Sequence, residues 1–179
     1  MPRFAARHRG SIWVSAVVIV ALAAPVVADA TRPLPGKRYA GTGVDRLNNG
    51  PHWMSFRSLP HEPFHFTVAP QGNTVLAFQG RLYFYCGAST ATVSASGIPV
   101  GAKGAFSYHF SVPTRQANGK ISGRTYVSIA GSFANRGQVA HVSYLVVFGK
   151  VHPAHDPYTA AGAYRDGCAS WVKGTATAN

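Results

Sequence analysis

The residues that most resemble a catalytic site stand at positions 61–65. Their sequence, His-Glu-Pro-Phe-His, fits the H-E-x-x-H pattern in which two histidines hold zinc and the glutamate acts as a base. The pattern requires a helix, because only a helix places both histidines on one face. Pro63 stands inside the motif, and a proline in a helix interior costs about 3 kcal/mol. We therefore predict a loop that runs into a strand, and not a metalloprotease.

A second group of metal-ligand types comprises His152, His155 and Asp156. Two imidazoles and a carboxylate suit a transition metal, with water or a distant ligand completing the coordination. His52, His61 and His65 would add to this set if the two long loops lie at the same end of the fold. The alternative is a polar surface loop with solvated histidines, since ligand spacing alone often matches by chance. The sequence therefore offers His152, His155 and Asp156 as a candidate metal site.

Other catalytic classes find less support. The chain has 5 Asp and Glu in total, whereas glycoside hydrolysis usually needs two carboxylates across a cleft. Asp156 and Asp166 form the only pair of carboxylates close in sequence outside the first 30 residues. The sequence has neither a G-x-S-x-G elbow nor a phosphate-binding glycine loop between a strand and a helix. We predict that the protein is not an enzyme and that it carries no cofactor.

The best local candidate for binding is the segment 81–85. If Leu82 points inward, Arg81, Tyr83 and Tyr85 form a basic aromatic row on the opposite face. Such a row can stack sugars or bases and pair with anions. The alternative is that a second layer covers this face, because aromatic residues in strands are enriched for packing. Trp53, in a polar segment, is a second candidate for ligand binding.

Short apolar alternations, which predict strands, must position these residues. The segments 64–68 and 106–112 place large apolar side chains at every second position, and 127–133 does the same except that Gly131 occupies one of these positions. Segment 138–148 is predicted to be the longest strand, and its apolar end suits a strand that is covered on both faces. Gly80 is expected to form a bulge or kink within a strand.

This spacing of strands and turns predicts an all-β fold, either an antiparallel β-sandwich or a closed β-barrel of about 7–9 strands. Residues 37–179 are expected to form a single β-domain, with a short tether at 31–36. The polar segments 50–63 and 150–164 are predicted to be long surface loops, where binding residues often lie.

The first 30 residues predict a cleaved secretory signal. Three arginines within the first nine residues precede an apolar run that ends at Pro25, and Ala28 and Ala30 then form an A-x-A cleavage pattern. The run is shorter than the ~20 apolar residues that a spanning helix needs. We expect cleavage near Ala30 and a mature protein that is secreted or associated with the cell envelope, with no transmembrane segment.

Two cysteines, Cys86 and Cys168, remain in the exported part. An isolated pair in an oxidising compartment predicts one disulfide, and the alternative is two buried thiols. The bond would close a loop of about 80 residues and stabilise the domain by roughly 4–5 kcal/mol. Trp171, close to the second cysteine, is expected in the core.

The chain is strongly basic, with 17 Lys and Arg and a formal net charge of +12 at pH 7. Such a surface attracts cell-wall polyanions, acidic glycans, anionic lipids or nucleic acid without selecting among them. The charge serves solubility equally well. Specific nucleic-acid binding is not expected, and the oligomeric state stays open.

Several short segments occur in an order that is similar to a group of functionally uncharacterised small secreted β-domain proteins of actinobacteria. The similar segments lie at 39–42, 64–68, 98–100, 104–107 and 127–133, together with the cysteines and Trp171. The resemblance covers most of 37–176, and the chain departs from it near 51–63 and 151–157. It implies a secreted β-domain and brings no activity and no site residues.

These observations together predict a secreted, non-enzymatic β-domain that binds anionic or glycan polymers of the cell envelope. One alternative is a protein-interaction module of an adhesin or inhibitor kind. The other is a metal protein that uses the histidine loop.

Overall fold

A computed structural model of the chain describes residues 31–48, 53–55, 61–84, 89–115, 118–148, 154, 156–159 and 168–179. At residues 47–48, 53–55, 84 and 89 it describes the backbone alone. The predicted signal at 1–30 therefore lies outside the described residues, as do Cys86 and both histidines of the second candidate metal site.

The described chain consists of strands joined by turns, with one short 3-10 turn, η2 (Asn135–Gly137). The strands are β1 (Arg38–Asn48), β2 (Trp53–Ser55), β3 (Glu62–Val68), β4 (Thr74–Phe84), β5 (Ser89–Ala95), β6 (Ile98–Pro99), β7 (Ala105–Arg115), β8 (Ile121–Ala134), β9 (Val139–Phe148) and β10 (Cys168–Ala178). The predicted loop at 50–63 contains β2 and the start of β3, so it is partly strand.

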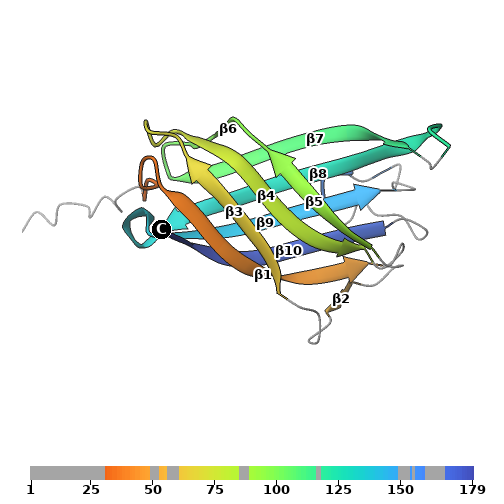
Figure 1. The fold of residues 1–179 in the computed structure, drawn as a ribbon, viewed down its shortest axis with the longest axis horizontal. Coiled ribbons are helices and arrows are strands. Elements are labelled where there is room, and N and C mark those ends of the chain that lie inside the picture. The colour runs from red at the N-terminus through yellow and green to blue at the C-terminus, as the bar shows by residue number, and fades with distance from the viewer. Residues whose placement is uncertain are drawn as a thin grey trace, which may run out of the picture.

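All ten strands belong to one sheet in the order β5-β4-β3-β1-β10-β9-β8-β7, with β2 paired to β1 and β6 paired to β4. Every strand pair is antiparallel. The sheet curls into a half-barrel around one core (Figure 1). The predicted antiparallel all-β class is confirmed, but neither the sandwich nor the closed barrel is.

The two sides of the curled sheet are joined at one end of the half-barrel only, and there through β6 instead of β5. There, β6 continues into an isolated bridge between Val100 and Phe106, which joins the two sides of the curled sheet. Towards the other end, β5 and β7 share no ladder, and the sheet stays open between them. The half-barrel is therefore a wedge that widens away from the bridge.

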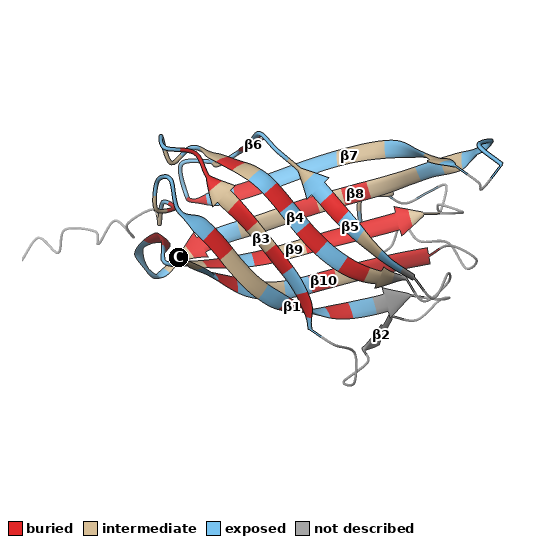
Figure 2. Ribbon diagram, viewed as in Figure 1, coloured by how far each residue is buried: buried red, intermediate tan, exposed pale blue. Residues whose placement is uncertain are grey.

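Buried residues alternate with more exposed ones along the strands on both sides of the curl (Figure 2). On β3, Phe64, Phe66 and Val68 are buried as predicted. The Phe66 ring stacks on Tyr39 with 4.9 Å between ring centroids. On β8, the predicted inward row of large residues in 127–133 is also buried. Period-two alternation therefore identified the core faces of these strands correctly.

The bulge predicted at Gly80 is wrong in position. Gly80 pairs regularly with Phe64 on one side and with Val93 on the other. The irregularity lies earlier in β4, where the β3–β4 register shifts and Ala77 has φ of 50°. A residue without a side chain is needed at Gly80 for another reason. A Cβ atom there would lie 2.7 Å from the Cζ atom of Tyr144.

The expectation that segment 138–148 forms the longest strand is also wrong, since β8 has 14 residues and β9 has 10. The two apolar faces of β9 are explained as predicted. Val146 lies in the main core, whereas Leu145 and Val147 form a second buried cluster on the outer face. Trp171 packs against this second cluster and is only partly buried, so it is not a residue of the main core.

The predicted tether at 31–36 is held against the domain by hydrogen bonds. The backbone N–H of Leu34 donates to the Tyr39 hydroxyl at 2.9 Å, and that hydroxyl donates to the carbonyl of Gly137. The N–H of Gly36 donates to the carbonyl of Ala69. Burial raises the pKa of the Tyr39 hydroxyl, which favours the neutral form that donates this bond.

Cys168 is buried at the start of β10. Because Cys86 lies outside the described residues, the disulfide stays a prediction. In the part of the chain that the structure describes, no helix has the length and apolar character needed to cross a bilayer.

Candidate functional site

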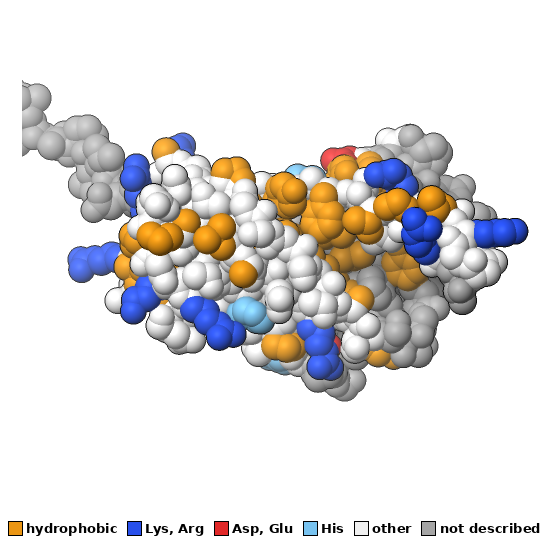
Figure 3. All heavy atoms as spheres, turned by 45° about the horizontal axis from the view of Figure 1, so that its top comes forward, with side chains coloured by type: hydrophobic (Ala, Val, Ile, Leu, Met, Phe, Trp, Pro, Cys, Tyr) orange, Lys and Arg blue, Asp and Glu red, His pale blue; other side chains and the backbone are white. Residues whose placement is uncertain are grey.

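The widening gap between β5 and β7 contains an apolar cleft of about 510 Å³. Its walls come from strands at the two ends of the sheet order, and β8 and β9 form its floor. Figure 3 views the molecule from this side and shows apolar side chains gathered in a hollow of the surface. The cleft exists because the curled sheet does not close at this end.

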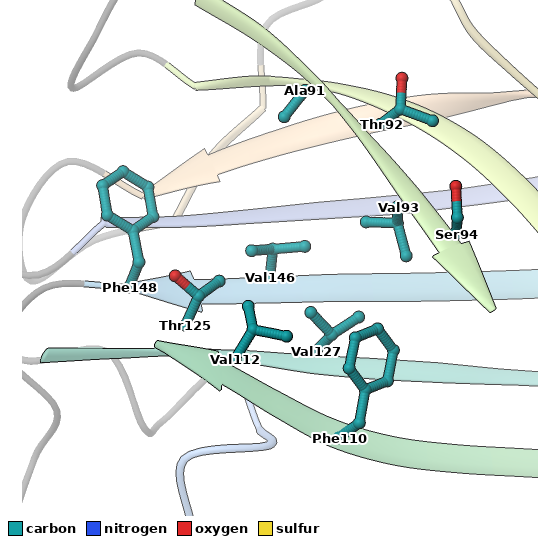
Figure 4. A pocket seen from close by; sticks show the side chains of 10 residues that line it. All are labelled: Ala91, Thr92, Val93, Ser94, Phe110, Val112, Thr125, Val127, Val146 and Phe148. Carbon is teal, nitrogen blue, oxygen red and sulfur yellow. The ribbon is translucent and has the colours of Figure 1, made fainter. Parts of the chain in front are cut away.

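Six large apolar side chains line the cleft from the four strands. They are Val93 of β5, Phe110 and Val112 of β7, Val127 of β8, and Val146 and Phe148 of β9. In Figure 4 these side chains converge on the space between the strands, whereas Thr92 and Ser94 point to the other side of β5. The inward rows of four strands therefore build one continuous apolar surface.

The cleft has a buried floor and an exposed rim. Val127 and Val146 are 5% and 3% exposed, whereas Val112 is 44% exposed. Among the described residues of the lining, the polar side chains are those of Thr92, Ser94 and Thr125. An apolar surface that water reaches is unfavourable, at roughly 25 cal/mol per Å², so an apolar occupant of the cleft would be stabilised.

A buried polar network lies beside the cleft floor, starting on β10, the strand next to β9 in the sheet. Ser170 of β10 pairs with Val146 in the sheet, and its hydroxyl donates to Asp45 Oδ1 at 2.8 Å. The backbone N–H of Tyr83 donates to Asp45 Oδ2 at 2.9 Å. Burial raises the pKa of Asp45, and these hydrogen bonds lower it by less.

Glu62 is the second acid of this network. Its carboxylate is buried, and Arg81 Nε lies 3.1 Å from Glu62 Oε2. The contact is an ion pair without hydrogen-bond alignment, because this oxygen accepts no hydrogen bond from the described residues. Burial raises the pKa of Glu62, Arg81 lowers it, and the nearby Asp45 raises it further.

Tyr144 connects the network to the core. Its hydroxyl donates to the carbonyl of Arg81, and its ring packs edge-on against Phe64 and Phe78. Burial, followed by the two acids, raises the pKa of Tyr144 well above its usual range. Asp45 and Tyr144 are held by hydrogen bonds, Glu62 is held by its ion pair with Arg81, and none of these residues lines the cleft. The network is best explained as a part of the structure.

The structure describes two of the three residues of the predicted basic aromatic row, Arg81 and Tyr83. Leu82 is fully buried, so Arg81 and Tyr83 do lie on the outer face of β4 as expected. Arg81 is half-exposed and pairs with Glu62, while Tyr83 is partly buried. Tyr85 and the side chain of Trp53 lie outside the described residues. Ligand binding by this row stays a prediction.

The H-E-x-x-H residues lie in and beside a strand, as predicted. Glu62 begins β3 and points inward, whereas His61 and Pro63 are exposed and His65 is partly buried. Two strand residues four positions apart are separated by about 13 Å, so His61 and His65 cannot hold one ion between them. Within the described residues no three His, Cys, Asp or Glu side chains gather as metal ligands.

Of the second candidate metal site, the structure describes Asp156 alone. Its carboxylate Oδ1 accepts the backbone N–H of Tyr158 at 2.9 Å, which stabilises the turn at 156–159. Tyr158 then packs edge-on against His109 and Tyr126, on the outer face of β7 and β8. The segment therefore lies on the sheet face opposite the cleft. Metal binding by His152 and His155 stays a prediction.

The sequence does not predict the cleft, although it contains one signal for it. Tyr108, Phe110 and Val112 form a clean alternation, and an alternation predicts which face of a strand is apolar but not whether another element covers that face.

Comparison of the chain with protein-family models, with curated proteins and with solved structures finds no match.

Proposed function

We propose that the protein is an exported, non-enzymatic binding domain whose cleft takes the hydrocarbon part of a small amphiphile. The observation that supports this proposal best is the open end of the half-barrel, where none of the described residues covers the apolar surface between β5 and β7. The predicted secretory signal implies that the mature protein works in the cell envelope or outside the cell.

The chemistry of the lining favours hydrocarbon over a polar ligand. The cleft has the size of small-molecule sites, which are mostly apolar cavities of about 300–1,000 Å³. The Thr125 hydroxyl can orient a ligand, and among the described residues the lining has no charged side chain and no histidine. General acid–base chemistry needs a titratable group within hydrogen-bond reach of the reacting atoms. The cleft therefore suits binding better than catalysis.

The uncharged dye N-phenyl-1-naphthylamine tests this proposal, because its fluorescence increases on transfer from water to an apolar site. We expect a saturable increase with the folded protein, and decanol should reverse it by competition. The proposal is wrong if the dye shows no saturable binding, or if only the unfolded protein raises its fluorescence.

The burial of acids supports a second candidate, the binding of anionic envelope polymers. Among the described Asp and Glu side chains, Asp45 and Glu62 are buried and Asp156 is exposed. Few acidic side chains among the described residues are therefore available to neutralise the positive charge of the surface Lys and Arg side chains. Co-sedimentation with isolated cell walls tests this candidate, since charge-driven binding should weaken steeply between ~50 and 500 mM salt.

A further inference from the structure

The β7–β8 hairpin extends beyond its neighbours at the open end of the half-barrel. The β8–β9 ladder ends at the pair of Tyr126 with Val147, whereas the β7–β8 ladder continues to the pair of Arg115 with Ile121. Figure 1 shows the end of this hairpin projecting past the ends of β9 and β10. A surface that approaches this end of the molecule would meet the hairpin first.

The projecting part of the hairpin combines an exposed apolar residue with positive charge. Ile121 is 62% exposed, more than any other large apolar side chain in the described residues. Arg115, Lys120 and Arg124 surround it in the sequence and are all exposed. The stretch 105–134 contains no Asp or Glu. Figure 3 shows Lys and Arg side chains gathered at this end of the apolar opening.

The contacts of these cations leave their charge unneutralised. Arg115 Nη1 donates to the carbonyl of Gly119 at 3.1 Å, and Arg124 Nη2 donates to the hydroxyl of Ser111 at 2.7 Å. Both acceptors are neutral, and in the described part of the chain neither arginine pairs with a carboxylate. The hydrogen bonds hold the two guanidinium groups in place and leave other N–H groups for a partner.

We propose that the tip of this hairpin, formed by Arg115, Lys120, Ile121 and Arg124, docks the protein on the surface of an anionic lipid bilayer. An anionic leaflet attracts basic residues close to its surface, and an apolar side chain among them can enter the boundary of the acyl chains. The tip fits this partner because it offers both features together. A purely polar polyanion would use the charges and leave Ile121 in water.

Docking would also bring the cleft to the source of an amphiphile. Val112 lines the cleft and lies on the strand that ends at Arg115, about 10 Å further along at the usual rise of a strand. The docking proposal does not depend on the proposed function, since the hairpin features stand whether or not the cleft binds hydrocarbon.

Sedimentation with lipid vesicles tests the docking. The full mature protein is mixed with vesicles of phosphatidylcholine alone, or of phosphatidylcholine with phosphatidylglycerol. We expect partition into the anionic vesicles only. Arg115→Gln with Lys120→Gln should weaken it by about fivefold for each cation lost, and Ile121→Ser should weaken it by about fivefold as well.

Matched controls separate a local effect of the hairpin from a general effect of charge or polarity. Arg38→Gln with Lys103→Gln removes two exposed cations elsewhere, and Val44→Ser changes an exposed valine on β1. Both should leave vesicle binding nearly unchanged. Circular dichroism should show the same folded spectrum for every variant.

The outcomes distinguish this proposal from its competitors. Absence of binding to anionic vesicles overturns the docking, and so does equal weakening by the control pair. If Ile121→Ser has no effect and polyphosphate displaces the vesicles, the tip is a polyanion site and the membrane proposal is wrong. Dye binding in the cleft is measured without lipid, so a failure there concerns the proposed function alone.

Discussion

At the scale of single residues, the most informative groups are the two acids that the sheet shields from water. Glu62 and Asp45 are 2% and 1% exposed, and both have a pKa raised by burial. The folded protein thus keeps their protons to higher pH than the unfolded chain does. Their contribution to stability is complete below the unfolded-state pKa of about 4 and is lost as the pH rises through the raised values.

We therefore predict that Glu62→Gln makes the free energy of unfolding less dependent on pH. The glutamine cannot ionise, so relative to the wild type the variant should gain stability from about pH 4 to pH 7. The pKa of Asp45 is also raised, and Asp45 is still present in this variant, so some pH dependence of stability should persist. Urea unfolding across this range measures the effect.

Arg81→Gln should have the opposite effect on the pH dependence of the free energy of unfolding. Removing the cation beside Glu62 makes ionisation of that acid more costly, so the loss of stability towards neutral pH should become steeper. Parallel pH profiles for the wild type and both variants would contradict the assignment of Glu62 as a buried, titrating acid.

At the scale of elements, the packing of β8 under β7 depends on a residue without a side chain. A Cβ atom on Gly131 would lie 2.7 Å from the carbonyl oxygen of His141 and 2.8 Å from Cε1 of Phe106. Both neighbours belong to strands paired with β8, so they cannot move away independently.

Gly131→Ala should therefore destabilise the protein by about 1–3 kcal/mol, as for other substitutions that overpack a core. Gly101→Ala is the matched control, because the same atom there would lie 3.4 Å from its nearest neighbour. The midpoint of urea unfolding should decrease for the first variant and stay nearly constant for the second. A similar midpoint for both would show that β8 can shift to make room.

The strands also differ in how much of their structure the sequence could predict. Alternation identified the inward faces of β3 and β8, because a side chain's face follows from its position in the strand. The bulge near Ala77 could not be predicted, since a register shift depends on the partner strand. The cleft depends on the order of strands in the sheet, and no local pattern shows that β5 and β7 become the two edges.

At the scale of the whole molecule, two predictions concern parts outside the described residues. We expect intact-mass analysis of the exported protein to place its first residue at or near Thr31. Its mass should increase on reduction by two hydrogen atoms, as one disulfide between Cys86 and Cys168 requires. An uncleaved N-terminus, or no change on reduction, would contradict these predictions.

The disulfide also has a predicted energetic effect. Cys168→Ala should lower the free energy of unfolding by about 2–5 kcal/mol, because it removes the cross-link that restricts the unfolded chain. Cys86→Ala should cost a similar amount, and the double variant should cost little more than either, since both changes break the same bond. Additive losses would show that the two cysteines act independently.

The central claim is that the open end of the half-barrel binds hydrocarbon. Titration with N-phenyl-1-naphthylamine of two matched variants tests it most directly. Val112→Trp places a large side chain in the cleft, and Val44→Trp makes the same change at a residue of similar exposure (41% against 44%) that does not line it. We predict that Val112→Trp weakens dye binding by about tenfold or more, equivalent to about 1.4 kcal/mol, and that Val44→Trp leaves it unchanged. Equal binding by both variants and the wild type would contradict the claim.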